Sequence, residues 1–545
     1  MGYWLNDAVF YEIYPQSFCD SNADGIGDIN GIISKLDYIQ DLGCNAIWMN
    51  PCYDSPFIDA GYDVRDYYKV APRYGTNDDM KRLCEDVHRR GMHILLDLVP
   101  GHTSDQCEWF RESQRDEKNE YTDRYIWTDT VWESIGDIVN VMGLTRGGTE
   151  RNGAYLANFF NSQPALNYGF ANPDPDRPWQ QPVDAEGPRA TVEAMKNVMR
   201  FWLSLGCDGF RVDMAGSLIK ADTDQSANIR LWQEFRDFLD KEYPHAVMVS
   251  EWSQPDKSLL AGFHMDFLLH FGPSHYMDLF RTETPFFSRK GEGDLTSFFD
   301  LYIKNMNKTR YRHPDAVVLP PIPDGGMMCI PSGNHDMVRM AHFLDQDEMK
   351  LAFAFIMSMP GVPFIYYGDE IGMKYVEGLT SVEGGYERTG SRSPMAFDGS
   401  ENAGFSSASA DKLYIKQDES RSYINVEAEE KDPDSLLNEV KVLTRMRQEH
   451  PALHNRSDFR LLEAGNRDSV LAFIRSCNRE SMLVIFNPSS RDMTLHFDLP
   501  DEYEIIHTAG RIKNEAVLDQ SCINRDNKKA SRSFPAESAV FLKTK

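Results

Sequence analysis

Short apolar runs that alternate with helical segments restrict the fold of this chain more than any other feature of its sequence. The runs lie at 9–15, 46–51, 93–102, 209–215, 247–252, 265–271, 327–336 and 361–370. Segments with the apolar spacing of helices separate several of them, at 31–43, 77–91, 191–206 and 231–244. Alternating strands and helices predict a parallel sheet. Eight repeats in a chain of 545 residues predict an α/β fold, the (β/α)8 TIM barrel.

Two segments depart from this alternation. About 100 residues separate the third run from the fourth, which is too long for a simple connection. We therefore expect an inserted subdomain over 103–185, within a catalytic barrel formed by 1–102 and 186–455. After a helical stretch at 432–453 the pattern changes to short apolar runs, at 459–464, 470–476, 481–488, 493–500 and 539–545. These runs predict a C-terminal all-β domain over 456–545, a β-sandwich.

The charge of the chain argues against two classes of partner. With 57 basic and 84 acidic residues the net charge is −27, which disfavours nucleic acid and anionic membrane surfaces. No segment approaches the roughly 18 apolar residues of a membrane span, and the N-terminal stretch lacks the basic region of a signal peptide. Nine cysteines without CxxC spacing fit a reducing compartment. We expect a cytoplasmic protein with no membrane partner.

Charged side chains end several of the predicted strands. In barrel enzymes the catalytic residues lie at the carboxyl ends of the strands. The third, fourth, fifth and seventh runs supply Asp97, His102, Arg211, Asp213, Glu251, Asn334, His335 and Asp336. The acidic residues of this set, two histidines and an arginine would thus meet at one mouth.

Paired carboxylates of this kind suit glycosidic bond cleavage. One carboxyl group must be protonated to help the leaving oxygen depart, and the other must be ionised to attack or stabilise the sugar carbon. A third acid nearby raises the pKa of the acid/base by repulsion, and an arginine two residues before the nucleophile keeps it ionised.

Four stretches at these positions resemble the signature motifs of the α-amylase superfamily, glycoside hydrolase family 13. They are DLVPGH, GFRVD, VSEW and GNHD, in the order and spacing of that family. Further stretches resemble its oligo-1,6-glucosidase, α-glucosidase and trehalose synthase branch, namely FYEIYPQSF, GYDVRDY, QPALNYG, YYGDEIGM and NAGFS.

The resemblance implies a role for each catalytic carboxylate. Asp213 would be the nucleophile of a retaining double displacement, Glu251 the acid and then the base, and Asp336 the partner that binds the sugar O2 and O3. His102 and His335 would hydrogen-bond the same glucose.

The resemblance also implies how the glucose would be held. Arg211 would orient the nucleophile and Tyr62 would stack on the sugar ring. Asp59 and Arg392 match a pair that grips the terminal O4 in exo-acting members and closes the pocket beyond it.

The loop D20-S-N-A-D-G-I-G-D28 has oxygen-bearing residues at alternate positions and a glycine for the turn. This arrangement resembles the start of a calcium loop. The family resemblance implies a structural Ca²⁺ held by Asp20, Asn22, Asp24, the Ile26 carbonyl and Asp28. A polar turn without metal is the alternative, and no organic cofactor is expected.

Some positions differ from the family pattern and leave the reaction open. Gly101 replaces an Asn that helps to organise a second calcium site in many α-amylases. Met214 follows the nucleophile, at a position where the type of residue in this branch tends to go with the glycosidic linkage that the enzyme prefers. The first hypothesis is a retaining exo-α-glucosidase for short gluco-oligosaccharides or disaccharides. The alternative is a transglucosylase or isomerase such as trehalose synthase, which uses the same glucosyl-enzyme.

Two further functions are disfavoured. A catalytically inactive scaffold does not fit an intact set of three acids, and an endo-amylase does not fit the match at Asp59 and Arg392. The expected partner is a small α-glucoside, and the oligomeric state is not predicted.

Overall fold

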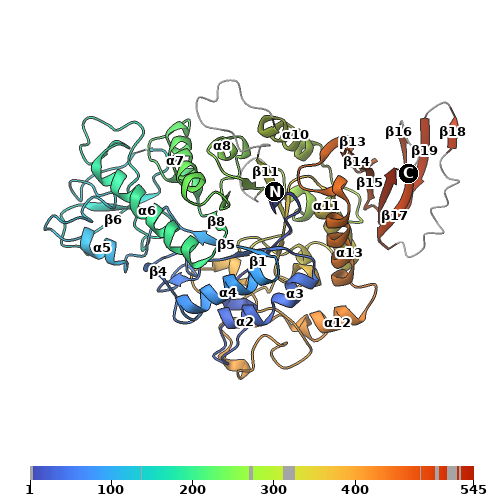
Figure 1. Ribbon diagram of the computed structural model, residues 1–545, viewed down its shortest axis with the longest axis horizontal. Helices are drawn as coiled ribbons and strands as arrows, with labels where there is room; N and C mark the ends of the chain where they lie inside the picture. Colours follow the sequence, from blue (N-terminus) through green and yellow to red (C-terminus); the bar gives the residue numbers. More distant parts are fainter. Residues whose placement is uncertain are drawn as a thin grey trace.

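The computed structural model describes residues 4–136, 138–268, 274–310, 326–478, 480–497, 503–511, 524–526 and 529–544. At its centre eight parallel strands form a closed barrel in the order β1-β12-β11-β10-β9-β8-β5-β2 (Figure 1). They are β1 (Phe10–Ile13), β2 (Ala46–Met49), β5 (His93–Leu98), β8 (Gly209–Val212), β9 (Val247–Ser250), β10 (Met265–Phe267), β11 (Met327–Pro331) and β12 (Val362–Tyr366). Each predicted run contains one barrel strand, which confirms the predicted fold class. Residues 269–271 of the sixth run lie outside the described residues.

Helices cover the outside of the barrel. They are α1 (Pro15–Phe18), α2 (Ile29–Ser34), α3 (Leu36–Asp41), α4 (Asn77–Arg89), α6 (Glu186–Leu205), α7 (Ser226–Glu242), α8 (Pro255–Leu260), α9 (Met277–Phe280), α10 (Thr296–Arg310), α11 (Gln346–Ser358), α12 (Val426–Lys431) and α13 (Leu436–Glu449). Capping boxes at Thr76 and Asp345 begin α4 and α11. The left-handed Gly206 ends α6, which lets the chain turn back into β8.

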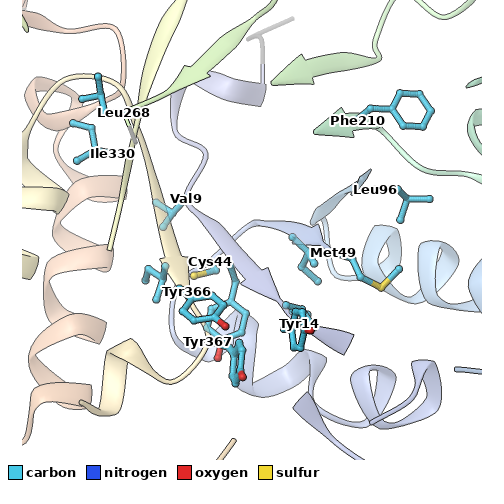
Figure 2. Packing of buried hydrophobic residues seen from close by; sticks show 14 of the residues in the cluster. Val9, Tyr14, Cys44, Met49, Leu96, Phe210, Leu268, Ile330, Tyr366 and Tyr367 are labelled. Atoms are coloured by element: carbon cyan, nitrogen blue, oxygen red, sulfur yellow. The ribbon is translucent and has the colours of Figure 1, made fainter. Parts of the chain in front are cut away.

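Side chains of the barrel strands alternate between two apolar layers. Phe10, Trp48, Leu95 and Phe364 point into the barrel, where they pack with one another and exclude water. The intervening residues face the helices, and Figure 2 shows part of this outer layer. Because strand side chains alternate with a period of two, one short run fills both layers.

The two irregular segments lie at opposite ends of the molecule (Figure 1). The insertion between β5 and β8 carries α5 (Glu108–Ser113) and the antiparallel pair β6 (Gly143–Arg146) and β7 (Ala154–Ala157). A smaller pair, β3 (Tyr53–Asp54) and β4 (Asp66–Val70), lies after β2.

The C-terminal segment forms two antiparallel sheets. One has the order β13-β14-β15-β20-β17 and the other β16-β19-β18. The strands are β13 (Asp458–Asn466), β14 (Ser469–Cys477), β15 (Glu480–Asn487), β16 (Met493–Phe497), β17 (Tyr503–Gly510), β18 (Asn524–Asp526), β19 (Lys529–Phe534) and β20 (Ser538–Thr544). The predicted positions 498–500 and 545 lie outside the described residues.

Two other observations concern the described part of the chain. No helix in it is both long and apolar enough to cross a membrane. All eight cysteines in it are free, and all but Cys477 are buried.

Candidate active site

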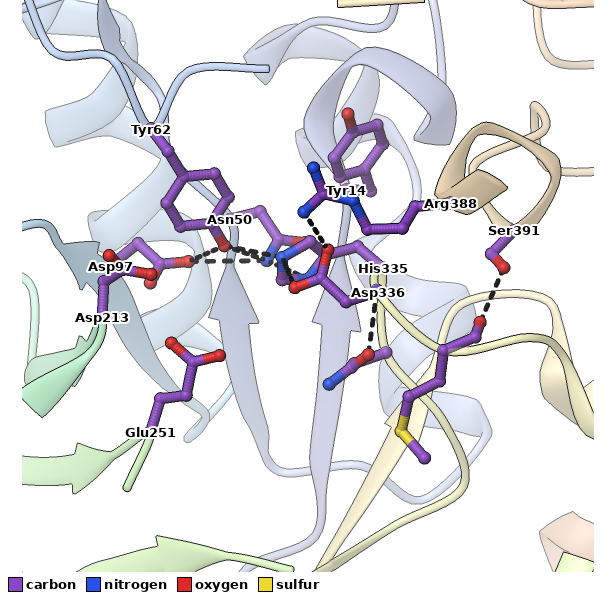
Figure 3. Close-up of polar contacts among 12 residues, drawn as sticks. Tyr14, Asn50, Tyr62, Asp97, Asp213, Glu251, His335, Asp336, Arg388 and Ser391 are labelled. Carbon is purple, nitrogen blue, oxygen red and sulfur yellow. Dashed lines mark hydrogen bonds and ion pairs between the residues drawn. The ribbon is translucent and has the colours of Figure 1, made fainter. Parts of the chain in front are cut away.

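A charged layer lies directly above the apolar interior of the barrel. Glu12 follows Phe10 on the inward face of β1, and Asp97 follows Leu95 on that of β5. Arg211 takes the equivalent place on β8, where it is 2% exposed. The alternation that buries apolar side chains below thus brings ionisable ones to the mouth of the barrel, where Figure 3 shows Asp97 beside Asp213 and Glu251.

Arg211 is the centre of this layer and contacts three carboxylates. Its Nη1 lies 2.6 Å from Asp97 Oδ1 and 3.2 Å from Asp213 Oδ1. Its Nη2 lies 2.9 Å from Glu251 Oε2. A single guanidinium therefore holds the proposed nucleophile and the proposed acid/base with two different nitrogens, which fixes both side chains relative to the same group.

Asp213 and Glu251 form an electrostatically coupled pair. Burial and the neighbouring Glu251 raise the pKa of Asp213 well above its ordinary value, while Arg211 opposes the shift. Repulsion between neighbouring carboxylates in general favours a proton on one of them. One protonated and one ionised carboxyl is the state that glycosidic cleavage requires.

The residue after Asp213 adopts an unusual backbone conformation. Met214 has φ 44° and ψ 39°, in the left-handed region that few residues other than glycine occupy. Its N–H donates to Glu251 Oε2 at 3.0 Å. This conformation therefore brings a second donor to the acid/base, beside Arg211.

His335 and Asp336 form the opposite side of the site. His335 Nε2 lies 3.1 Å from Asp336 Oδ2 and 2.8 Å from the Tyr62 hydroxyl. Arg388 and Arg392 each donate to Asp336 Oδ1 at 2.9 Å. Burial raises the pKa of Asp336, but His335 and both arginines outweigh burial and hold that pKa well below its ordinary value. Asp336 is thus fixed as an anion.

The second histidine of the site, His102, is neutral. Burial lowers the pKa of His102 to about 4, so the ring is neutral at pH 7. His102 Nε2 lies 3.1 Å from the Tyr62 carbonyl oxygen, and the Asn158 amide lies 2.9 Å from Nδ1. These neighbours fit the tautomer with the proton on Nε2. A Cβ at Gly101 would lie 2.8 Å from the Asn158 amide nitrogen, so the glycine leaves space for that contact.

The structure places a second arginine, Arg388, between Asp59 and Asp336. Arg388 Nη2 lies 3.6 Å from Asp59 Oδ1, and the Gln163 amide donates to Asp59 Oδ2 at 2.8 Å. Arg392 instead binds the His335 carbonyl at 2.9 Å besides Asp336. Arg388 therefore links Asp59 to Asp336 and closes one side of the site.

The carboxylates of the loop from Asp20 to Asp28 accept hydrogen bonds mainly from the loop itself, and Ser406 also donates to Asp20 Oδ2. Asp20 accepts from the N–H groups of Asn22, Ala23 and Gly25. Asp28 accepts from Ser21 and caps α2 through Gly31 N, and Asp24 accepts from Ile26 N. Within the described residues no three His, Cys, Asp or Glu side chains gather closely enough to bind a metal. The carboxylates would have to turn inward to hold Ca²⁺.

Several residues of the site were not expected from the sequence. Glu12 lies inside an apolar run, and only the period-two pattern from Phe10 could have placed it at the mouth. Arg388 lies in a connecting segment, four residues before Arg392. Gln163 and Asn158 come from the insertion, where no periodic pattern indicates which side chains point inward.

Comparison with known proteins agrees with the fold and the site. Residues 12–456 match the catalytic domain of alpha amylase. The barrel and its carboxylates therefore define an enzyme that acts on O-glycosidic bonds. The chain belongs to the α-amylase family, glycoside hydrolase family 13.

Relatives with known functions cover nearly the whole chain. The trehalose synthase/amylase TreS of Mycolicibacterium smegmatis is 34% identical over 536 residues, 88% of this chain and 81% of its own. An oligo-1,6-glucosidase of Parageobacillus thermoglucosidasius is 28% identical over 603 residues, 99% and 98% of the two chains. The crystal structure of a mutant of MutB with its substrate sucrose superimposes with a TM-score of 0.77 at 27% identity, over 99% of each chain.

Proposed function

We propose that this protein is a retaining transglucosylase that isomerises small α-linked disaccharides, in the manner of trehalose synthase. One observation carries the proposal: Arg211 joins Asp213 and Glu251 in a site that Arg388 closes between Asp59 and Asp336. A guanidinium between these two carboxylates would limit that side of the site to one terminal glucose and leave the opposite side for the sugar that departs and returns.

The chemistry follows from the charges of the site. The Asp213 carboxylate attacks the anomeric carbon while the glycosidic C–O bond breaks, and Glu251 gives its proton to the leaving oxygen. A hydroxyl of the released sugar then attacks the same carbon. Its proton goes to Glu251, and the bond to Asp213 breaks. Asp336, held as an anion by His335, Arg388 and Arg392, stabilises the positive charge that develops on the sugar in both steps.

Hydrolysis is the second candidate, because water can replace the returning sugar in the second step. It corresponds to the exo-α-glucosidase, and the oligo-1,6-glucosidase similarity favours it. Three trehalose synthase/amylase relatives are 33–34% identical, against 28–30% for two oligo-1,6-glucosidases, and solved structures of the trehalulose synthase MutB align over the whole chain. The comparisons thus support sugar transfer over hydrolysis.

Product analysis separates these two reactions. The protein is incubated with maltose, sucrose, trehalose and isomaltose in turn, and the products are identified by chromatography. The proposal predicts an isomeric disaccharide in excess of free glucose for at least one substrate. Release of the constituent monosaccharides alone from every cleaved substrate would support the hydrolase instead.

We also propose that the loop from Asp20 to Asp28 binds a structural Ca²⁺, which the spacing of its oxygen donors supports. A bound ion stabilises the folded state, so the melting temperature should rise by a few degrees in excess Ca²⁺ over EDTA. Asp24→Ala should remove the rise. Identical melting in both solutions would leave the loop as a polar turn.

The free cysteines indicate the cellular compartment in which the protein works. We propose a cytoplasmic protein, because an odd number of cysteines with no disulfide in the described part fits a reducing environment. Fractionation of the source cells tests this, and recovery outside the cytoplasm would contradict it.

A further inference from the structure

A fully buried carboxyl group lies behind the histidine of the active site. Glu12 is 0% exposed on β1, and its Oε1 lies 2.9 Å from His335 Nδ1. No protein donor reaches its Oε2 among the described residues. An unsatisfied buried carboxyl oxygen costs free energy, so the contact that Glu12 makes with His335 needs an explanation.

Both ring nitrogens of His335 face carboxylates. Glu12 is at Nδ1, and Asp336 Oδ2 is 3.1 Å from Nε2. The Asn50 amide, oriented to satisfy both of its ends, donates to Glu12 at 3.3 Å and accepts from His335 Nδ1 at 3.1 Å. Acceptors on both sides require a proton on each nitrogen, so the geometry fits an imidazolium between two anions.

We propose that Glu12 is a positioning residue, which keeps His335 doubly protonated so that Nε2–H is donated to Asp336. This inference rests on the proposed function, because it concerns how the same site is kept active as pH rises. Glu12 does not reach the reacting atoms, and it acts through His335 alone.

The charges around the ring agree with this role. Burial lowers the pKa of His335, but Asp336 and Glu12 outweigh burial and raise it to about 9. Burial raises the pKa of Glu12 to about 7, against the pull of His335 and Arg211. The ionisable groups that face the pair from the surrounding elements are Tyr14, Tyr62, Asp97, Arg211, Asp336, Tyr366, Arg388 and Arg392. Of these, only Asp336 is an anion in direct contact with the ring.

The test is the pH profile of kcat/KM for Glu12→Gln with an α-glucoside that the wild type cleaves. A neutral amide cannot stabilise the imidazolium, so the alkaline limb should move to lower pH by about one unit or more. The conservative Glu12→Asp keeps the charge and should keep the limb near its wild-type position, with a lower kcat. It also provides a folded variant if Glu12→Gln does not fold.

Glu370 offers a matched control. It is equally buried, its pKa is also raised to about 7 by burial, and it accepts from the hydroxyls of Tyr11 and Tyr38 instead of a site residue. Glu370→Gln should therefore leave both limbs of the profile unchanged.

A second readout is independent of turnover. Imidazole ¹⁵N shifts of histidine-labelled protein, with His335 assigned by its loss in His335→Asn, should show a protonated ring at pH 8 in the wild type and a neutral ring in Glu12→Gln. A neutral His335 in the wild type, or an unshifted alkaline limb in a folded Glu12→Gln, would overturn the proposal. A failure of the proposed function would alter the products and leave these shifts as expected.

Discussion

The lower and upper layers of the barrel interior are formed by the same strands, but the lower layer is apolar and the upper layer is charged. Phe10, Leu95 and Phe364 belong to an apolar layer that gains stability by excluding water. Two positions further along the strands, Glu12, Asp97 and Arg211 form a layer of buried charges. Buried charges cost desolvation free energy and add stability only when they are well paired. The upper layer is therefore maintained for chemistry, and the lower layer supplies stability that offsets its cost.

The largest expected effect is a loss of turnover, and it should follow substitution at one end of β8 and not at the other. Asp213→Asn, after β8, should lower turnover of an α-glucoside by about 10⁴-fold or more, because the nucleophile is lost. Asp208, before β8, binds His88 and the N–H of Ile94 instead. Asp208→Asn should keep nearly full activity. Steady-state kinetics measure the turnover of both variants, and circular dichroism checks that they fold. Equal losses of turnover in the two variants would contradict the assignment of catalysis to the mouth of the barrel.

Removing the cation of the upper layer should affect both activity and stability. Arg211→Met leaves Asp97, Asp213 and Glu251 without their common partner, so the free energy of unfolding should fall by about 3–5 kcal/mol at pH 7. Part of this loss should be recovered at pH 4, where the carboxyl groups take up protons. Denaturant titration at the two pH values measures it. A variant as stable as the wild type would show that the layer needs no cation.

A cavity in the lower layer should affect stability alone. The Phe364 ring is 0% exposed and stacks on Phe10 at 4.3 Å between centroids. Phe364→Ala should lower the free energy of unfolding by about 3–5 kcal/mol. At temperatures where the variant stays folded, kcat should change by no more than a few-fold. A loss of activity without a loss of stability would break the distinction between the layers.

The smallest expected effect is a gain in stability, from substitution of Asp59. Burial raises the pKa of Asp59 to about 6, against Gln163 and Arg388, so this carboxyl favours its neutral form in the folded protein. The group therefore lowers stability progressively as pH rises from about 4 to about 6, and the full penalty remains above that. Asp59→Asn should raise stability at pH 7 by about 1–3 kcal/mol while activity falls. Thermal melts from pH 4 to pH 7 check this, and a constant difference over that range would contradict it.

The sequence predicts the barrel well because its signals are local. A short apolar run with a period of two determines both layers of one strand, and helical spacing identifies the elements between them. The strand-end residues Asp213, Glu251 and His335 could be placed at one mouth for the same reason. The insertion has no such period, so the inward positions of Asn158 and Gln163 could not be derived from it.

Two details depend on tertiary geometry. Arg388 lies within a short 3₁₀ segment, Tyr386–Ser391, and Arg392 directly follows it, so the turn of this segment decides which guanidinium lies nearest Asp59. Glu12 lies in the middle of FYEIYP, where an acidic residue on an apolar strand gives no indication of its partner. Its partner His335 follows β11, and β12 lies between β11 and β1 in the barrel.

Covalent trapping of the nucleophile tests the central claim most directly. The protein is incubated with 5-fluoro-α-D-glucosyl fluoride, digested and analysed by mass spectrometry. We expect a fluoroglucosyl mass increase on the peptide that contains Asp213, and none in Asp213→Asn. A label on another carboxylate, or turnover of the reagent with no covalent adduct, would contradict the account.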